Sequence, residues 1–136
     1  MRNIVADTGP LVALFYRRDR NHVRVREFLR DHPCLLVTTW AVATEVWHLL
    51  PRPAGLEFMR WVTAGGVAVL EMGSDDGSSM FALLEKYRDR PMDLADASLV
   101  VLADRLGISD ILTIDRSDFD VYRLSGNRRF VQVLSI

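Results

Sequence analysis

The sequence Asn-Ile-Val-Ala-Asp-Thr-Gly-Pro-Leu-Val-Ala-Leu-Phe, residues 3–15, decides the fold class of this chain. Its first four residues form a short, largely apolar run with two β-branched members, which predicts a strand over residues 3–6. Leu11, Leu14 and Phe15 then recur at helical spacing, so a helix is expected directly after the strand. A strand that leads at once into a helix indicates an α/β fold built on a parallel sheet.

The same alternation continues along the chain. Further strands are predicted over residues 35–38, 67–71, 111–114 and 130–134, and helices over residues 23–29, 40–50, 56–64, 74–88 and 93–106. Pro51 and Pro53 end the helix over residues 40–50, and Gly107 lies just beyond the end of the last helix. We therefore expect a central parallel sheet of four to five strands, covered by helices on both faces.

Length and composition favour a single domain over residues 1–136. With 49% hydrophobic and 26% charged residues, a chain of this length can bury a core without disulfides or a structural metal. No apolar run approaches the roughly 18 residues of a membrane span. Asp7, Gly9 and Pro10 interrupt the N-terminus before the apolar region of a signal peptide develops. We expect a cytoplasmic protein that does not enter a membrane.

Four acidic residues that are far apart in the sequence fall at one predicted edge of the sheet. Asp7 and Asp115 each follow a strand, and Asp96 lies in the first turn of the helix over residues 93–106. Glu45 lies about two turns into the helix after the second strand, where its longer side chain still reaches that edge. Open parallel sheets build their sites at the carboxyl ends of their strands, so we expect these carboxylates to meet there.

Each position also has a purely structural interpretation. Asp7 is a suitable N-cap for the helix that follows it, and Asp93 and Asp96 resemble a capping box at a helix start. Asp115 fits an ordinary turn, and Glu45 fits a solvated helix face, although its sequence neighbours are mostly apolar. For Asp93 the cap is the preferred interpretation. For the other four acids, Asp7, Glu45, Asp96 and Asp115, only their common location at one edge of the sheet favours a functional site.

A cluster of carboxylates is stabilised by a bound cation. Carboxylates that lie close together repel each other, and their oxygens are the ligands that Mg²⁺ or Mn²⁺ prefers. With two ions bound, one ion generates a hydroxide nucleophile and the other stabilises the leaving oxygen of a phosphodiester. We therefore expect hydrolytic phosphodiester cleavage without a protein nucleophile. Whether one ion or two are bound stays open.

The segments that carry the four acids resemble the successive acidic motifs of PIN-domain ribonucleases, above all the VapC-type toxins of type II toxin–antitoxin pairs. These segments are VADTGPLVAL (5–14), TEV (44–46), DLADAS (93–98) and LTIDRSDF (112–119), and they occur in the same order over essentially the whole chain. The resemblance implies a three-layer α/β/α PIN-like fold and an Mg²⁺- or Mn²⁺-dependent endoribonuclease.

The resemblance also implies roles for individual residues. Asp7, Asp96 and Asp115 match the metal-binding aspartates of the family, and Glu45 matches the glutamate close to the metal. Thr113 lies two residues before Asp115, hence on the same side of a strand, and matches the small hydroxyl residue beside the site. These four acids are the expected catalytic and metal-binding residues.

Further residues near the motifs are candidates for supporting or substrate-binding roles. Thr8 is suited to hold Asp7 or a water, and Asp93 and Asp118 are candidates for support, although a helix cap and a turn explain these two acids as well. Arg116, next to Asp115, is the expected phosphate contact. Arginine supplies 16 of the 17 basic residues; phosphate binding and the codon usage of a GC-rich genome explain this equally well.

The expected partners are RNA, a cognate antitoxin and a second copy of the chain. Trp40 and Trp47 on one predicted helix, and Met59 and Trp61 on the next, would form the antitoxin groove or dimer surface that the family has. Core packing is favoured for at least two of these four side chains. The segment Pro51-Arg52-Pro53 departs from the family pattern and could reshape the substrate groove.

Other classes of protein fit the sequence less well. A dehalogenase-like phosphotransferase needs a second acid two residues after Asp7, where this chain has Gly9. A response-regulator receiver needs a lysine after a late strand, but Lys86 lies in a helical pattern. The remaining alternative is a non-catalytic PIN-fold module that binds RNA or protein, although such a module has no need of four carboxylates.

Overall fold

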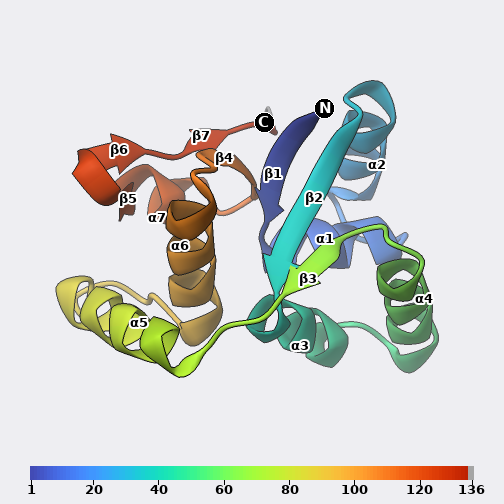
Figure 1. Ribbon diagram of the computed structural model, residues 1–136. Coiled ribbons are helices and arrows are strands. Elements are labelled where there is room, and N and C mark those ends of the chain that lie inside the picture. The colour runs from blue at the N-terminus through green and yellow to red at the C-terminus, as the bar shows by residue number, and fades with distance from the viewer. Residues whose placement is uncertain (135–136) are drawn as a thin grey trace.

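The computed structural model describes residues 1–134 and is built on a five-stranded, wholly parallel sheet (Figure 1). In the order β3-β2-β1-β4-β7, its strands are β3 (Ala68–Leu70), β2 (Cys34–Thr39), β1 (Arg2–Ala6), β4 (Asp110–Leu112) and β7 (Val131–Gln132). Val5 at the centre pairs with Val37 on one side and with Ile111 on the other. The predicted sheet is confirmed, although β3, β4 and β7 are shorter than expected.

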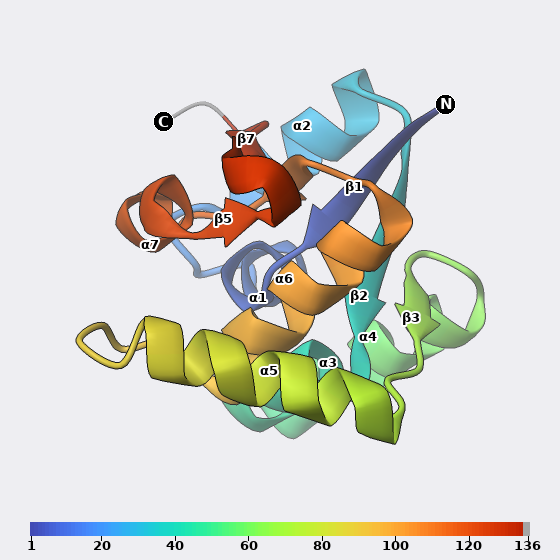
Figure 2. The same cartoon turned by 60° about the vertical axis from the view of Figure 1, so that its left-hand side comes forward.

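Seven α-helices surround this sheet. They are α1 (Thr8–Phe15), α2 (His22–Asp31), α3 (Trp40–Leu49), α4 (Arg52–Thr63), α5 (Ser74–Lys86), α6 (Leu94–Leu106) and α7 (Arg116–Val121). Helices α1, α2 and α4 lie on one side of the sheet, and α5 and α6 lie on the other (Figures 1 and 2). Helix α3 follows β2 directly and contacts α1, α4 and α6. The expected three-layer α/β/α arrangement is confirmed.

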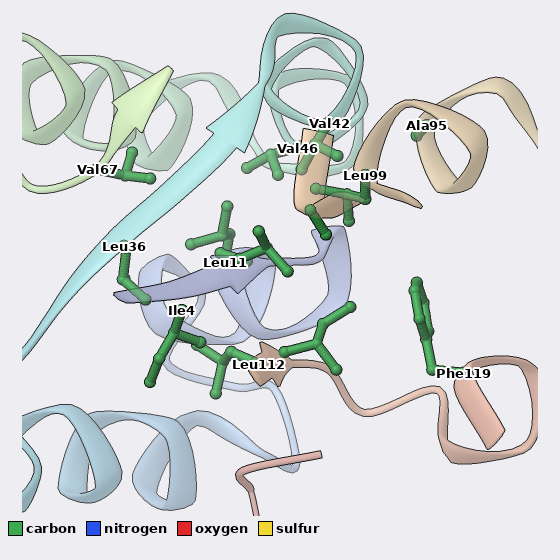
Figure 3. Close-up of a cluster of buried hydrophobic side chains, with 14 of the residues drawn as sticks. Ile4, Leu11, Leu36, Val42, Val46, Val67, Ala95, Leu99, Leu112 and Phe119 are labelled. Atoms are coloured by element: carbon green, nitrogen blue, oxygen red, sulfur yellow. The ribbon is translucent and has the colours of Figure 1, made fainter. Parts of the chain in front are cut away.

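The central strands are buried on both faces, as strands of a covered parallel sheet must be. Ile4 and Val5 of β1 and Ile111 of β4 have no exposed surface. Helix side chains close over them, among them Val46 of α3 and Leu99 of α6 (Figure 3). This apolar centre fixes the carboxyl ends of β1, β2 and β4 relative to one another, and the candidate site is built on those ends.

The segment Pro51-Arg52-Pro53 is not a loop, contrary to the expectation from sequence. Helix α3 ends at Leu49 as predicted, but α4 begins at Arg52, four residues earlier than the predicted Leu56. Proline is tolerated in a first helical turn because the backbone N–H it lacks has no partner there. The connection between the two helices is therefore very short, and the effect of this segment on the substrate groove stays a prediction.

The sequence patterns also missed two small elements near the C-terminus. These are helix α7 and a hairpin of β5 (Arg123–Leu124) and β6 (Arg128–Arg129), joined by the 3₁₀ turn Ser125–Asn127. Two-residue strands and a six-residue helix are too short to show a hydrophobic period.

Within residues 1–134, no helix has both the length and the apolarity needed to cross a membrane.

Candidate active site

Asp7 is held at the end of β1 by hydrogen bonds to both of its carboxylate oxygens. Its Oδ1 accepts from the backbone N–H of Thr8 at 2.8 Å, and its Oδ2 accepts from the hydroxyl of Thr113 at 2.8 Å. Asp7 is also the N-cap of α1, so the capping interpretation is confirmed, and the role of Asp7 in a catalytic site stays a prediction. The pKa of this carboxyl is raised to about 6: burial raises it most, the hydrogen bonds from Thr113 and Thr8 oppose the rise, and the charges of Asp115 and Glu45 add to it.

Thr113 joins the ends of β1 and β4. Its hydroxyl donates to Asp7 and accepts the backbone N–H of Asp115 at 3.0 Å, and the residue is wholly buried. The side chain therefore fixes the position of one acid and the backbone of another. This agrees with the role beside the site that the sequence suggested for Thr113.

Asp96 lies in the first turn of α6, where Asp93 caps the helix. The Asp93 carboxylate accepts the backbone N–H of Asp96 at 2.8 Å, so the predicted cap is confirmed. The Asp96 carboxylate accepts a hydrogen bond from the Tyr122 hydroxyl at 3.2 Å. Burial, followed by the charges of Asp7 and Asp93, raises the pKa of Asp96 to about 7. Burial also raises the pKa of the Tyr122 phenol, which therefore stays protonated as a donor.

Glu45 projects from α3 towards the same acids. The helix begins at a cap formed by Thr39, whose hydroxyl accepts the backbone N–H of Val42 and shares a 2.7 Å hydrogen bond with Ser98 of α6. This bond ties the start of α3 to α6. Burial raises the pKa of Glu45, and the neighbouring Asp93 carboxylate raises it further.

Thr8 lies between Asp7 and Glu45. Its hydroxyl is close enough to Glu45 to oppose the rise in the pKa of that carboxyl. Within residues 1–134, no hydrogen bond of ordinary geometry reaches this buried oxygen, Thr8 Oγ1. A buried hydroxyl without a partner is costly, and Thr8 is therefore suited to bind a water or another ligand beside the two acids.

Asp115 precedes α7, and its acidic neighbour is Asp118. Burial raises the pKa of Asp115, the Asp118 carboxylate raises it further, and Arg90 opposes the rise. Asp118 is buried and accepts a 3.0 Å hydrogen bond from the guanidinium of Arg90. Asp118 is therefore part of an ion pair at the border of the site and more than the turn residue that the sequence suggested.

The structure thus brings all four predicted acids into one electrostatic network. The charge of Asp7 influences Asp96, and the charges of Asp115 and Glu45 influence Asp7. The carboxylate oxygens suit a hard divalent cation. Even so, among residues 1–134 no group of three or more His, Cys, Asp or Glu side chains is arranged closely enough to hold a metal ion as it stands. The carboxylate oxygens are suitable ligands for such an ion, but some of these side chains would have to move before several of them could bind the same ion.

Comparison with known proteins agrees with this fold. Ribonuclease VapC26 of Mycobacterium tuberculosis is 29% identical over 134 residues, which cover 96% of this chain and 99% of that protein. The crystal structure of Mycobacterium tuberculosis VapC20, a toxin that cleaves the sarcin-ricin loop, superimposes with a TM-score of 0.80 at 22% identity and covers 97% of this chain and 99% of that one. The chain thus resembles VapC-type PIN-domain ribonucleases over nearly its whole length.

A second solved structure extends the comparison. A toxin–antitoxin complex from Klebsiella pneumoniae superimposes with a TM-score of 0.64 at 18% identity, over 87% of this chain and 91% of that one. At this level of identity the likeness concerns the fold. No family model matches the chain.

Among the basic residues, Arg90 lies beside the acids, bonded to Asp118 and opposing the rise in the pKa of Asp115. The predicted phosphate contact, Arg116, is exposed at the start of α7, and its carbonyl oxygen accepts a hydrogen bond from Gln132. Arg90 was missed because it lies in a turn, 28 residues from its partner Asp118. Tyr122, at the end of α7 and 26 residues from its partner Asp96, was also missed. No local pattern marks either residue.

The aromatic side chains of α3 and α4 divide between core and surface. Trp61 packs against Phe15 and Phe58, and Met59 is partly buried against the core. Trp40, by contrast, has 48% of its surface exposed. The expectation that core packing accounts for at least two of the four is therefore confirmed.

Proposed function

We propose that this protein is the RNA-cleaving toxin of a toxin–antitoxin pair and that it hydrolyses phosphodiester bonds at the carboxylate cluster with Mg²⁺ or Mn²⁺. One observation supports this most directly. Asp7 is buried and Asp96, from a different element, is partly buried close enough to feel its charge, and their pKa values are raised to about 6 and about 7. Carboxylates in this state gain most from a cation between them.

The proposed ligands are Asp7, Asp96 and Asp115, with Glu45 adjacent. Each oxygen of Asp7 accepts one hydrogen bond and keeps further lone-pair capacity for a metal ion. Asp7 is fixed, whereas Asp115 and Glu45 are partly exposed and free to adjust. When bound, the metal would activate a water and stabilise the charge that develops on the phosphate.

The remaining residues would hold these acids in place. Thr113 sets Asp7 and the backbone of Asp115, and Tyr122 orients Asp96. The Arg90–Asp118 pair offsets part of the negative charge near Asp115. The Thr113 hydroxyl is fully engaged in hydrogen bonds, which favours water over this side chain as the nucleophile.

The proposed partners follow from the relatives. A ribonuclease and a toxin–antitoxin complex are among the proteins that the chain resembles, so we propose RNA as substrate, a cognate antitoxin as inhibitor and the cytoplasm as the place of action. A homodimer stays a prediction. Exposed apolar side chains on α3 and α4, such as Leu49 and Leu56, are available for either protein contact.

A cleavage assay with purified protein tests the proposal. We expect the protein to cut single-stranded RNA with Mn²⁺ or Mg²⁺, and an excess of chelator to stop the reaction. Asp7→Asn and Asp96→Asn should each abolish cleavage. Asp31→Asn is the matched control, because Asp31 is exposed at the end of α2, before the amino end of β2, and it should cut RNA at the parent rate.

Two results would contradict the proposal. Full activity in both Asp7→Asn and Asp96→Asn would exclude the carboxylate cluster as the reaction centre. RNA binding without cleavage at any Mg²⁺ or Mn²⁺ concentration would instead support the non-catalytic binding module.

A further inference from the structure

The indole of Trp40 separates two hollows of the molecular surface. One hollow, of about 340 Å³, lies between the starts of α3 and α6, and Leu94 and Met72 contribute to its wall. The other, of about 330 Å³, lies between α3 and α4 and is lined by Trp47 and Met59. Trp40 contributes to both walls and is still about half exposed. A large flat ring is thus presented to solvent with space beside it.

The hollow of about 340 Å³ adjoins the carboxylates. Leu94, in its wall, stands between Asp93 and Asp96 at the start of α6. Ala41, also in the wall, precedes Glu45 by one helical turn and therefore shares a face of α3 with it. A strand of RNA whose phosphate lies at the acids must pass close to this hollow.

The chemistry of the wall favours a base over a phosphate. Leu94, Met72 and the ring of Trp40 are apolar, and the carboxylate of Glu71 adds negative charge that repels phosphate. The Ser98 hydroxyl is buried and already bonded to Thr39 and to the carbonyl oxygen of Ala95. The wall therefore suits the flat, neutral face of a nucleobase.

We propose that Trp40 is the stacking platform for one unpaired nucleobase that flanks the scissile phosphodiester, with the hollow of about 340 Å³ as its binding site. The proposal rests on the proposed function, because it assumes that RNA is the substrate. Unpaired bases stack on aromatic side chains whatever their identity. The Trp40 site thus selects single-stranded over paired RNA and sets the path of the strand across the acids.

RNA affinity tests this site in a protein that leaves the RNA intact. In the Asp7→Asn background, we expect Trp40→Ala to raise the Kd for a fluorescent single-stranded RNA by about 10-fold, as loss of one stacked base does. Trp40→Phe keeps a ring and should stay within about threefold of the parent. Phe81→Ala is the control, since Phe81 is an exposed aromatic residue on α5 and lines neither hollow; its Kd should not change.

An abasic scan then identifies the base. Each nucleotide of the RNA is replaced in turn by an abasic residue. We expect one position to weaken binding when Trp40 is present and to have no effect in Trp40→Ala. If Trp40→Ala folds poorly by circular dichroism, the scan is repeated in Trp40→Phe, whose smaller ring should reduce the effect at that same position; an unchanged effect there would overturn the proposal.

Other occupants of the surface give different results. Trp40→Ala with unchanged RNA affinity overturns the proposal, and a simultaneous change in molar mass by light scattering would assign Trp40 to an interface between copies. The cleavage assay separates the two proposals. Absence of metal-dependent cleavage by the parent overturns the proposed function, whereas normal cleavage with equal Kd values for the parent and Trp40→Ala overturns only the stacking site.

Discussion

The carboxylate of Asp7 performs two tasks at once. It begins α1 as the N-cap and it forms the most deeply buried part of the acid network. The two donors that reach it, from Thr8 and Thr113, explain how an acid can be buried at a strand end without an arginine or lysine partner. At the scale of single residues, capping and function are therefore compatible uses of the same side chain.

Thr113→Val tests this arrangement. Valine keeps the shape of threonine but removes the donor to Asp7 and the acceptor for the Asp115 N–H, both buried. We expect the free energy of unfolding to fall by about 1–3 kcal/mol and kcat for RNA cleavage to fall by about 10- to 100-fold, as for other residues that orient metal ligands.

Thr113→Ser is the matched control for this change. It retains the hydroxyl and should stay close to the parent in kcat and in denaturant midpoint. If the valine variant cleaves RNA as fast as the serine variant, Thr113 does not position the acids.

At the scale of elements, the start of α6 connects helix stability with the site. Asp93 caps the helix and places Asp96 in its first turn, but the Asp93 charge also raises the pKa values of Glu45 and Asp96. A neutral capping residue would still cap the helix but would no longer raise the pKa values of Glu45 and Asp96. The element therefore tolerates electrostatic repulsion in order to hold Asp96 in position.

Asp93→Asn and Asp93→Ala separate these two effects. Asparagine caps a helix as well as aspartate does, so Asp93→Asn should unfold no more easily than the parent. Asp93→Ala should lose about 1 kcal/mol of the free energy of unfolding. Urea titrations of the two variants and the parent give the comparison, and equal losses in both variants would show that the cap does not stabilise α6.

At the scale of the whole molecule, the buried acids make metal-free stability depend on pH. The pKa values of Asp7 and Asp96 rise from 3.8 to about 6 and about 7 on folding. The folded state thus holds protons that the unfolded state has released. The stability that these groups contribute is complete below pH 3.8 and is lost as pH rises through about 6 to 7.

A thermal melt with chelator present measures this dependence. Between about pH 5 and pH 8 we expect Tm to fall by about 5 °C or more. Asp7→Asn should reduce the fall, because asparagine carries no charge at either pH. Adding Mn²⁺ at pH 8 should raise the Tm of the parent more than that of Asp7→Asn. A parent Tm that is flat or rising over this range would show that the acids are not destabilised by their neighbours.

The structure confirms some of the predictions made from sequence patterns and corrects others. The strand and helix order, the sheet edge that carries Asp7, Asp96 and Asp115, and the position of Thr113 were all predictable, because they follow from short periods and strand ends. The start of α4 was predicted too late, and α7 and the β5–β6 hairpin were missed. Elements of two to six residues are too short to show a hydrophobic period. A proline in the first turn of a helix looks, in the sequence, like a proline that ends a helix.

The sequence by itself determined the α/β class, the parallel sheet and the four acids at its edge, because each depends on local patterns and on the geometry of parallel strands. Only the tertiary structure decided that Arg90 pairs with Asp118 beside the acids, that Tyr122 bonds Asp96, and that Trp40 borders two hollows. These contacts join side chains from turns and helices that are distant in the chain, and their distances are set by packing of the whole core.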